Sequence, residues 1–487
     1  MSLLQRLVSL FSAHEAPPPQ EIRVVPCTGL DVAARAVVLT TGLVIDARLD
    51  SKTLEQTLAK LIEHKFPRAG ARLAYRNGVY EFHVPRTFAA GTPPFAFTVE
   101  DHPEPYRSPT RPELPIHRPA SAQPSVQPLP ALEVYFRSRE CPTTLAGFLV
   151  PNMPSLHVHV AVFDDLTYIG LTSSHICFDA LGTRTLLYAW TRLLMGDALD
   201  TIQGMEWDTA PFDAFTGPPV VAHPHGWFDL GFFSQLYFAL RLLWPIAKDP
   251  KEVVHIVRVP KVFLDDAKRE IMDDLKRQGS SEWVGSSDVL MAWWLKTVYS
   301  HRRPDDTTPI HVHFPADLRD KPIFAGAAAL PTPYIHNAVL GIPIPPLPAN
   351  AFSGARLGAL ALHIRRAVLA FDADPAQIAA DLRWRCTHPA KALFPCPPRG
   401  EYTGQTNWRK ARFGALDFSG ACRGATRGPG ARGRVVFCVG LSSSRTRVPY
   451  RGNGIVLMED EDAVWMRQVR GAKDWESIRR SGTVAFS

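Results

Sequence analysis

The sequence predicts a two-domain protein of the mixed α/β class. Its 487 residues exceed the size at which one hydrophobic core usually stops growing, so two domains are expected. Hydrophobic residues make up 46% and charged residues 21%, which is typical of a globular protein that folds in water. The segment 156–194 shows a strand-like alternation of apolar residues followed by a helical apolar pattern, so both element types are expected in one domain.

We divide the chain into three parts. The expected parts are an N-terminal lobe over 1–215, a crossover linker over 216–255 and a C-terminal lobe over 256–487. Within the first lobe, 102–130 is rich in proline and has little helical or strand periodicity, so a surface loop is expected there. The second lobe is expected to open with the strand VVHIVRVP and a helix over 263–277.

The linker contains the most hydrophobic run of the chain, GFFSQLYFALRLLWPI over 231–246. It is shorter than the ~20 residues that a membrane-spanning helix needs, and Gln235, Arg241 and Pro245 interrupt it. We interpret it as a helix that covers an inter-domain groove, with peripheral membrane contact as the less favoured alternative. The first residues, MSLLQRLVSLFSAHEAPPP, lack the continuous apolar region of a signal peptide and predict an amphipathic leader.

The most informative segment is 156–194. It predicts an apolar strand, a turn at Asp164–Asp165, a second strand ending on His175 and a helix from Ala180. A histidine at the end of a sheet strand can face a cavity, where it is suited to accept a proton near neutral pH. A structural histidine buried at a strand end is the alternative interpretation.

The spacing of His175 and Asp179 is weak evidence alone because histidine followed four residues later by aspartate occurs four times. The four pairs are His175/Asp179, His225/Asp229, His301/Asp305 and His313/Asp317. Only the first lies between an apolar strand and an amphipathic helix, and Gly182 then permits close packing.

Five segments in order resemble the plant-and-fungal acyltransferases called the BAHD family, whose hallmark is H-x-x-x-D-[AG]. These segments are 54–73 (LEQTLAKLIEHKFPRAGARL), 175–180 (HICFDA), 286–298 (SSDVLMAWWLKTV), 315–339 with its ADLRDK and PYIHNAV runs, and 406–408 (TNW) with Asp417 nine residues after Trp408. Together they span most of residues 35–420. The block YEFHVP…PPFAFTVEDH looks more like the fungal branch than the plant branch.

The resemblance implies two chloramphenicol-acetyltransferase-like lobes, each a mixed β-sheet with flanking helices. It also implies transfer of an acyl group from acyl-CoA to a hydroxyl or amine of a small-molecule acceptor of secondary metabolism. His175 would be the general base, and the acceptor would attack directly in a ternary complex. Acyl-CoA would be a co-substrate, with no permanently bound cofactor.

The same resemblance assigns further site residues. Asp179 would point away from the cavity and pair with Arg319, and Asn337 would have a structural role near the domain interface. Thr406 would lie on the oxyanion side and Trp408 would wall the channel; a turn threonine and a core tryptophan are the alternatives.

Ser286, Ser287 and Asp288 form a cluster typical of a helix start, where capping is favoured over binding of a coenzyme phosphate. The family motif D-F-G-W-G is altered to Asp417-Phe418-Ser419-Gly420-Ala421, followed by the stretch CRGATRGPGARGR. Asp417, Ser286 and Ser287 are therefore candidate coenzyme contacts, and the alteration predicts weaker coenzyme affinity.

Charge and cysteine usage restrict the remaining possibilities. The net charge is +7, and residues 399–451 hold eleven Arg or Lys against two acids. We favour a solvated surface, then coenzyme phosphates. Nucleic acid ranks a distant third because no binding motif is present, so no nucleic-acid partner is expected. Seven cysteines without a C-x-x-C pair predict reduced thiols, a cytoplasmic location and no metal site. We also expect a monomer without a transmembrane segment. Cys177 is expected to be buried filler rather than a nucleophile.

Two alternatives from other functional classes stay open. A carrier-protein-dependent condensation enzyme shares the histidine motif, but it normally has histidine and glycine where this chain has Ser174 and Ala180. The other alternative is a catalytically inactive relative that only binds a small molecule or a protein, which the altered 417–421 motif favours.

Overall fold

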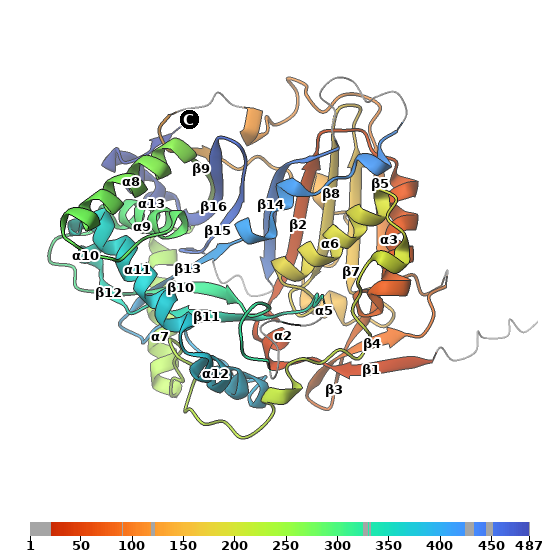
Figure 1. Cartoon of the computed structure of the whole chain (residues 1–487), viewed down its shortest axis with the longest axis horizontal. Coiled ribbons are helices and arrows are strands. Elements are labelled where there is room, and N and C mark those ends of the chain that lie inside the picture. The colour runs from red at the N-terminus through yellow and green to blue at the C-terminus, as the bar shows by residue number, and fades with distance from the viewer. Residues whose placement is uncertain are drawn as a thin grey trace, which may run out of the picture.

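The computed structural model describes residues 21–89, 91–117, 122–324, 330, 333–423, 433–444 and 451–486. The N-terminal leader and most of the CRGATRGPGARGR stretch lie outside the described residues. The fold is mixed α/β with three sheets, as the sequence predicts. Figure 1 shows a five-stranded sheet on one side of the molecule and a larger sheet on the other.

The five-stranded sheet carries the segment that the sequence analysis singled out. Its strands, in spatial order, are β14 (Val435–Ser444), β2 (Val37–Ile45), β8 (Thr167–Ser174), β7 (Leu156–Val162) and β5 (Ala96–Asp101). All neighbours are antiparallel except β5 and β7. Strand β8 is buried along its whole length because it is central, with β2 and β7 as neighbours.

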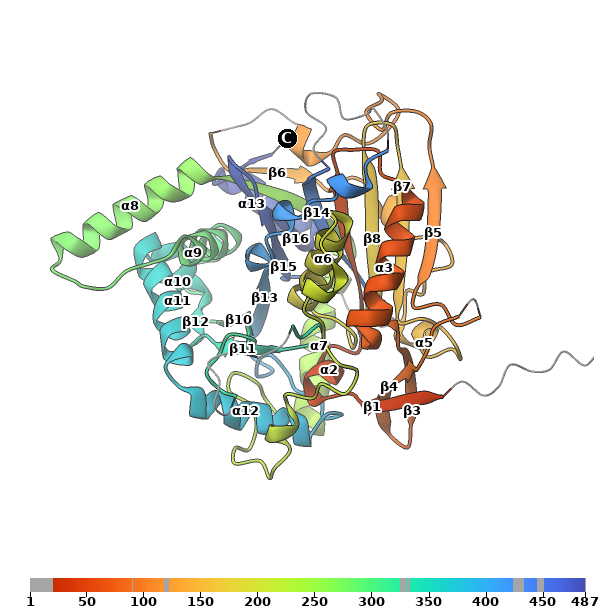
Figure 2. The same ribbon diagram turned by 45° about the vertical axis from the view of Figure 1, so that its right-hand side comes forward.

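Two helices cover one face of this sheet, α3 (Ser51–Lys65) and α6 (Ala180–Leu194) (Figure 2). The indole of Trp190 in α6 donates to Thr57 in α3 at 3.0 Å, so the helices are joined by a hydrogen bond as well as by packing. The predicted strand–turn–strand–helix order is confirmed, with the second strand ending at Ser174, one residue before the predicted end.

The larger sheet has nine strands. They are β12 (Leu347–Pro348), which pairs with β10, and then in spatial order β11 (Val339–Pro343), β10 (Pro309–Asp317), β13 (Glu401–Asn407), β15 (Gly454–Glu459), β16 (Ala463–Gly471), β9 (Glu252–Pro260), β6 (Ser125–Pro128) and β17 (Ala485–Phe486). A third sheet holds β1 (Ile22–Pro26), β4 (Val79–Pro85) and β3 (Arg72–Arg76).

The helices beside the larger sheet are α8 (Lys261–Arg277), α9 (Ser286–Tyr299), α10 (Ala349–Gly354), α11 (Leu357–Asp372) and α13 (Ala472–Ser481). The remaining helices are α2 (Gly29–Ala33), α4 (Glu133–Phe136), α5 (Leu145–Phe148), α7 (Phe232–Lys248) and α12 (Pro375–Thr387). Strand β9 and helix α8 confirm the predicted opening of the second lobe.

The two large sheets exchange strands. β6, from the first part of the chain, pairs with β9 in the nine-stranded sheet, and β14, from the last part, pairs with β2 in the five-stranded sheet. The prediction of an irregular loop over 102–130 is therefore wrong at Ser125–Pro128. This strand is short and contains one buried apolar residue, Val126, so no alternation could reveal it.

Helix α7 departs from a second expectation, because none of its residues is fully buried, whereas a helix that covers an inter-domain groove would bury one face. Only Ser234, Phe238, Arg241, Leu242 and Ile246 are partly buried.

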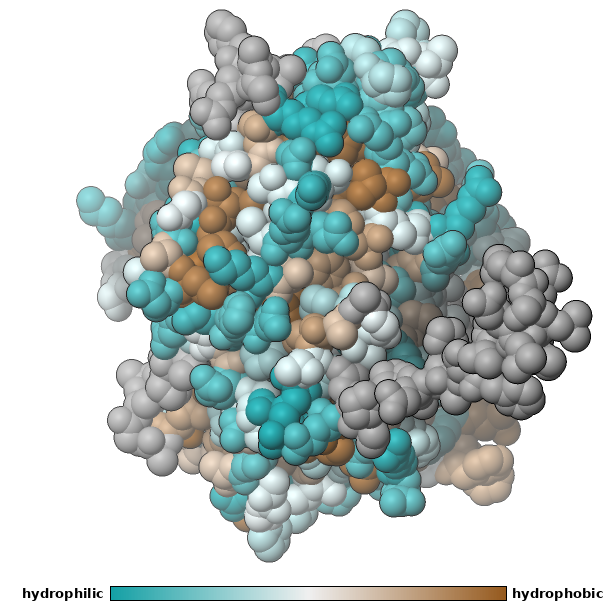
Figure 3. Space-filling view, turned by 90° about the vertical axis from the view of Figure 1, so that its right-hand side faces the viewer, coloured by the Kyte–Doolittle hydropathy of each residue, from teal (hydrophilic) through white to brown (hydrophobic). Residues whose placement is uncertain are grey.

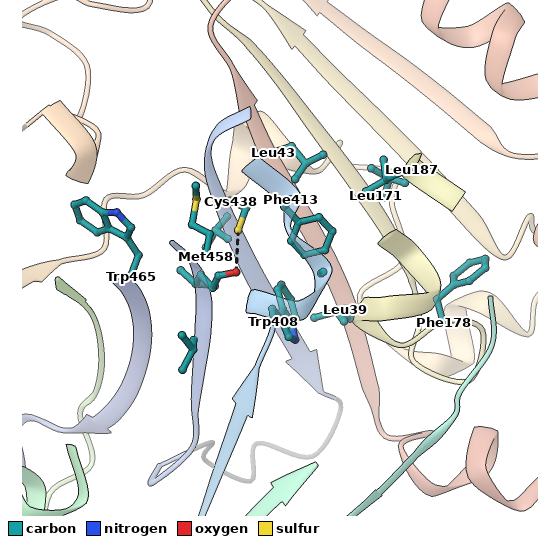
Figure 4. Close-up of a cluster of buried hydrophobic side chains, with 14 of the residues drawn as sticks. Leu39, Leu43, Leu171, Phe178, Leu187, Trp408, Phe413, Cys438, Met458 and Trp465 are labelled. Carbon is teal, nitrogen blue, oxygen red and sulfur yellow. Dashed lines mark hydrogen bonds between the residues drawn. The ribbon is translucent and has the colours of Figure 1, made fainter. Parts of the chain in front are cut away.

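A buried cluster joins the two sheets near β13 (Figure 4). Trp408 meets Phe413 edge to face, with ring centroids 5.9 Å apart. The Trp408 ring lies over Gly440 of β14, where an added Cβ would come within 2.5 Å of it. The thiol of Cys438, also in β14, donates to the Leu457 carbonyl at 3.4 Å. Glycine at 440 is thus what allows the tryptophan to pack between the sheets.

Candidate active site

A cavity of about 1100 Å³ is lined by residues from both large sheets and from the loops between them. The structure brings five of the predicted site residues to its walls: His175, Asp179, Ser287, Thr406 and Trp408. The described lining does not include Ser286, Arg319 or Asp417.

His175 is placed in the wall by the end of β8. Its backbone N–H donates to the Val37 carbonyl at 2.9 Å, which extends the pairing with β2 by one step. The ring is half-buried, and its Nδ1 lies 3.1 Å from Oδ1 of Asn337.

The surroundings of Asn337 fix the tautomer of His175. Three acceptors converge on Nδ2 of Asn337: the carbonyls of His175 (2.8 Å) and Ile176 (3.0 Å), and the Asp31 carboxylate (3.2 Å). An amide oxygen cannot donate to these acceptors, so the NH₂ group faces them and the amide oxygen faces the imidazole. Nδ1 of His175 is therefore the donor, and the lone pair of the neutral ring lies on Nε2.

Asp31 holds Asn337 in this position. It is 1% exposed and also accepts from the backbone N–H and hydroxyl of Thr28, each at 2.8 Å, and from the Asn337 N–H at 3.2 Å. Burial raises the pKa of Asp31, while these hydrogen bonds act in the opposite direction. Sequence analysis missed Asp31, because it lies 306 residues before Asn337 and only the folded chain brings the two together.

Asp179 is fixed on all sides. One carboxylate oxygen accepts from the Gly182 N–H at 2.6 Å and from Arg319 at 2.9 Å, and the other accepts from the Ala338 N–H at 3.0 Å. Arg319 also pairs with Asp317 at 2.9 Å. Asp179 is thus the N-cap of α6 and makes the expected contact with Arg319. Together these contacts hold the loop that carries His175 in place.

Gly182 allows the start of α6, which Asp179 caps, to lie close to the second lobe. A Cβ at this position would lie 1.8 Å from the Ile335 carbonyl oxygen, so only glycine allows the start of α6 to approach this segment. The close packing expected of Gly182 is therefore observed.

Thr406 and Trp408 enter the cavity from the end of β13. Thr406 is partly exposed, and no hydrogen bond of its hydroxyl is found within the described part of the chain. Trp408 is 4% exposed, with its backbone N–H bonded to Val456 at 2.8 Å, so it is a wall residue that also belongs to the core. A free hydroxyl beside a rigid indole can donate to a developing negative charge.

The start of α9 differs from the expected serine cap. Gly285 is the N-cap, and the Asp288 carboxylate accepts from its N–H at 2.7 Å and pairs with Arg365 at 2.8 Å. Ser286 and Ser287 are therefore the first two helical residues. The Ser287 hydroxyl faces the cavity, where Asn407 donates to it at 3.4 Å and Arg409 also contacts it.

Asp417 is used in a turn. It pairs with Arg434 at 2.9 Å, and its carboxylate accepts from the Ser419 N–H at 2.9 Å. Phe418 is fully buried against Trp190, and a Cβ at Gly420 would lie 1.9 Å from the Leu194 carbonyl. The altered motif thus packs against the end of α6 and the loop after it.

Sequence reasoning missed a second histidine–carboxylate contact in the cavity. Nδ1 of His225 lies 3.1 Å from Asp381, a buried residue of α12, and not beside Asp229. His313 lines the cavity too and contacts the Pro395 carbonyl at 2.7 Å. Arg385, one turn after Asp381, lies with its guanidinium 5.1 Å from the Trp227 ring centroid, and burial lowers its pKa to about 10.

Other candidates for chemistry are excluded by their surroundings. Burial raises the pKa of the Cys177 thiol well above its usual range, so no thiolate nucleophile forms there. Burial lowers the pKa of His157 to about 4, which keeps its ring neutral at physiological pH. Among the described residues, no three His, Cys, Asp or Glu side chains are grouped to hold a metal ion. No helix in the described ranges combines the length and apolar character needed to cross a membrane.

Known proteins resemble this chain both in sequence and in fold. No family model matches the chain. The chain is 27% identical over 448 residues to the acetyltransferase adrJ of Penicillium rubens, covering 85% of this chain and 86% of adrJ. It is 28% identical over 401 residues to the acetyltransferase pyiB of Pyricularia grisea, covering 77% and 75%. Among solved structures, TRI101 of F. sporotrichioides, complexed with coenzyme A and T-2, has a TM-score of 0.61 at 14% identity and covers 94% of this chain and 97% of its own.

These comparisons support a fungal BAHD-type acyltransferase.

The similarity to the acetyltransferases supports acyl transfer in secondary metabolism as the general chemistry of the site. The two-lobed fold expected from the family resemblance is confirmed. In this BAHD-type chain the residues of the histidine motif lie at a cavity that both large sheets build, as transfer between two bound substrates requires.

Proposed function

We propose that this protein transfers an acyl group from acyl-CoA to a hydroxyl or amine of a small-molecule acceptor, with His175 as the general base. The observation that carries the proposal is the orientation of His175. Its Nδ1 is bound by Asn337, so its basic Nε2 is available at a cavity large enough for two substrates. Geometry of this kind suits a base that works on a bound acceptor.

The proposed reaction is one direct displacement. Nε2 of His175 takes the proton from the acceptor as its oxygen or nitrogen attacks the thioester carbonyl. The new bond creates a tetrahedral oxyanion, to which the Thr406 hydroxyl donates. The carbon–sulfur bond then breaks, and the coenzyme thiolate takes the proton from the His175 imidazolium. The products are an ester or amide and free coenzyme A, and His175 is neutral again.

Two observations support acyl-CoA as the donor. TRI101, the structural neighbour described above, is complexed with coenzyme A. In this chain, Ser287 and Arg409 face the cavity beside the start of α9, where polar side chains and helical N–H groups can receive phosphate oxygens. Arg409 and Lys410 already pair with Glu459 and with Asp317 and Asp320, so the expected affinity for the phosphates is moderate.

Asp179 and Asn337 are proposed as positioning residues. Asp179 touches Arg319, Gly182 and Ala338, and it therefore holds the His175 loop against the second lobe. Asn337 fixes the imidazole directly. Loss of Asp179 or of Asn337 would slow the reaction by displacing His175, although neither residue contacts the reacting atoms.

Calorimetric titration with coenzyme A and with acetyl-CoA tests the donor without knowledge of the acceptor. We expect micromolar binding by the wild type and by His175→Ala, because the base does not hold the coenzyme. Binding of coenzyme A would then justify a screen of alcohols and amines, in which His175→Ala is the inactive control. No binding by a folded sample would reject acyl-CoA as the donor.

A further inference from the structure

Helix α7 presents an unusual surface. Seven large apolar side chains on its outer side are 46–82% exposed: Phe232, Phe233, Leu236, Tyr237, Leu240, Leu243 and Trp244. They recur at intervals of three and four residues, so they form one continuous stripe along the helix. Over α3 and β5, by contrast, hydrophilic side chains are interspersed with the hydrophobic ones (Figure 3).

The opposite side of α7 is attached to the body of the protein. Phe238 packs against Phe394 with ring centroids 5.1 Å apart, and the backbone of Asp249, at the C-cap, accepts from Arg451. The helix is therefore apolar on both sides, but the described chain covers only one. Such a helix needs a second apolar environment outside the protein.

The charges around the stripe are basic. Arg241 is the only charged residue between Leu230 and Ala247. At the C-terminal end, the Lys248 ammonium lies 4.7 Å from the Trp244 ring centroid, and Lys473 donates to the Lys248 carbonyl at 2.6 Å. The neighbouring acids are engaged, since Asp229 pairs with Lys391 at 2.7 Å and Asp249 is buried beside Arg451. This end of the helix complements an anionic surface.

The composition of the stripe favours a membrane surface as its partner. Four of the seven side chains are aromatic, and Lys248 and Lys473 lie at the C-terminal end of the helix. Aromatic residues with flanking cations suit shallow insertion at a membrane surface. A second copy of the chain is the other occupant, which the experiment below distinguishes from a membrane.

We propose that α7 anchors this protein to the surface of an anionic lipid membrane, with the stripe inserted at the headgroup boundary. Helix α7 follows Trp227, and its contact Phe394 lies between Leu393 and Pro395; these flanking residues line the cavity. An anchored molecule would thus hold one edge of its cavity beside the lipid phase, from which an apolar acceptor can enter without crossing water. The anchor itself does not depend on the proposed reaction.

Co-sedimentation with vesicles tests the anchor on the full chain. We expect the wild type to bind vesicles of phosphatidylcholine with phosphatidylglycerol, and more weakly those of phosphatidylcholine alone. The triple variant Phe233→Ser, Leu240→Ser, Trp244→Ser should bind at least tenfold more weakly. Lys248→Gln should weaken binding to the anionic vesicles about fivefold, with little effect on the neutral ones.

A matched triple variant controls for surface hydrophobicity in general. Val134, Val150 and Val262 are 49–62% exposed on other elements, and their replacement by serine should leave vesicle binding unchanged. Both triple variants should keep the wild-type melting temperature because the changed side chains are exposed. The proposal is overturned if the wild type stays in solution with both vesicle types, or if the α7 triple variant binds as the wild type does. A lipid-free dimer that only the α7 triple variant disrupts would also overturn it, in favour of a second copy.

Discussion

Two histidine–aspartate pairs of identical spacing place their histidines in the wall of the same cavity, but their aspartates have different roles. In His175/Asp179 the aspartate is the cap of α6 and binds Arg319, while the histidine is oriented by an amide oxygen from the other lobe. In His225/Asp229 the aspartate binds Lys391 near the surface, while the histidine is oriented by Asp381. The spacing is the same, but the elements around it differ.

The difference shows what a short motif needs before it becomes a site. Asp179 follows a buried strand and opens a helix, so its carboxylate is surrounded by backbone N–H groups and a guanidinium. Asp229 precedes a helix whose N-cap is Gly231, and its side chain is 40% exposed. Asp179 is therefore held in one position by the fold, whereas Asp229 forms an ion pair that is exposed to solvent.

The largest expected effect separates the two histidines. His175→Ala should lower kcat by roughly 10²–10⁴-fold, the usual contribution of a general base. His225→Ala should change kcat much less, because the His225 side chain is 48% exposed and is held by Asp381 of α12, whereas His175 follows the end of β8. Steady-state kinetics of both variants with an acceptor found by screening measures the ratio. Equal losses would show that spacing alone, and not context, selects the base.

Replacement of Asp179 should lower the free energy of unfolding substantially. Asp179→Ala leaves Arg319 partly buried without one of its carboxylates, and loss of one partner of a buried pair costs about 3–5 kcal/mol. Because Asp317 still contacts Arg319, we expect the lower end of this range. Urea unfolding of Asp179→Ala and wild type gives the difference. An unchanged unfolding free energy would contradict this role of Asp179.

Asn337 sets the orientation of the His175 imidazole. Asn337→Ala removes the acceptor for Nδ1 and leaves the buried Asp31 carboxylate without one donor, so about 1–3 kcal/mol of stability should be lost. We expect kcat to fall by about tenfold or more while KM for the acceptor changes little. A rise in KM with kcat unchanged would mean that Asn337 binds the acceptor instead.

The smallest effect is expected at the second aspartate. Asp229→Ala removes only a pair whose side chains are 40–45% exposed, which is worth under about 1 kcal/mol and less in high salt. Thermal unfolding of Asp229→Ala beside Asp179→Ala, at low and high salt, completes the comparison. A loss as large as that of Asp179→Ala would show that the two aspartates are equivalent after all.

Local sequence was enough for part of this site. Alternation over 156–162, the apolar run before His175 and the helical pattern after Ala180 predicted the elements, because each depends on neighbours along the chain. Gly182 was also informative. Asn337 was expected from the family resemblance to have a structural role near the domain interface. Asp31 could not be found in this way, since its contact with Asn337 arises only when α2 meets the segment before β11.

The failures at β6 and α7 have physical reasons. β6 has four residues and is defined by pairing with β9, so only the completed sheet reveals it. The run over 231–246 was correctly expected to be helical, but its hydrophobicity does not state which of its sides faces the protein. In both cases the missing information lies in tertiary contacts.

The strand exchange has a consequence for how the molecule is made. Strand β2, VVLTTGLVI, can pair with β14 only after nearly the whole chain has left the ribosome. Until then one edge of an apolar strand stays open, and open edges of this kind recruit other chains. We therefore expect the first lobe expressed alone to aggregate, and the intact protein to depend on chaperones during synthesis more than its finished fold would indicate.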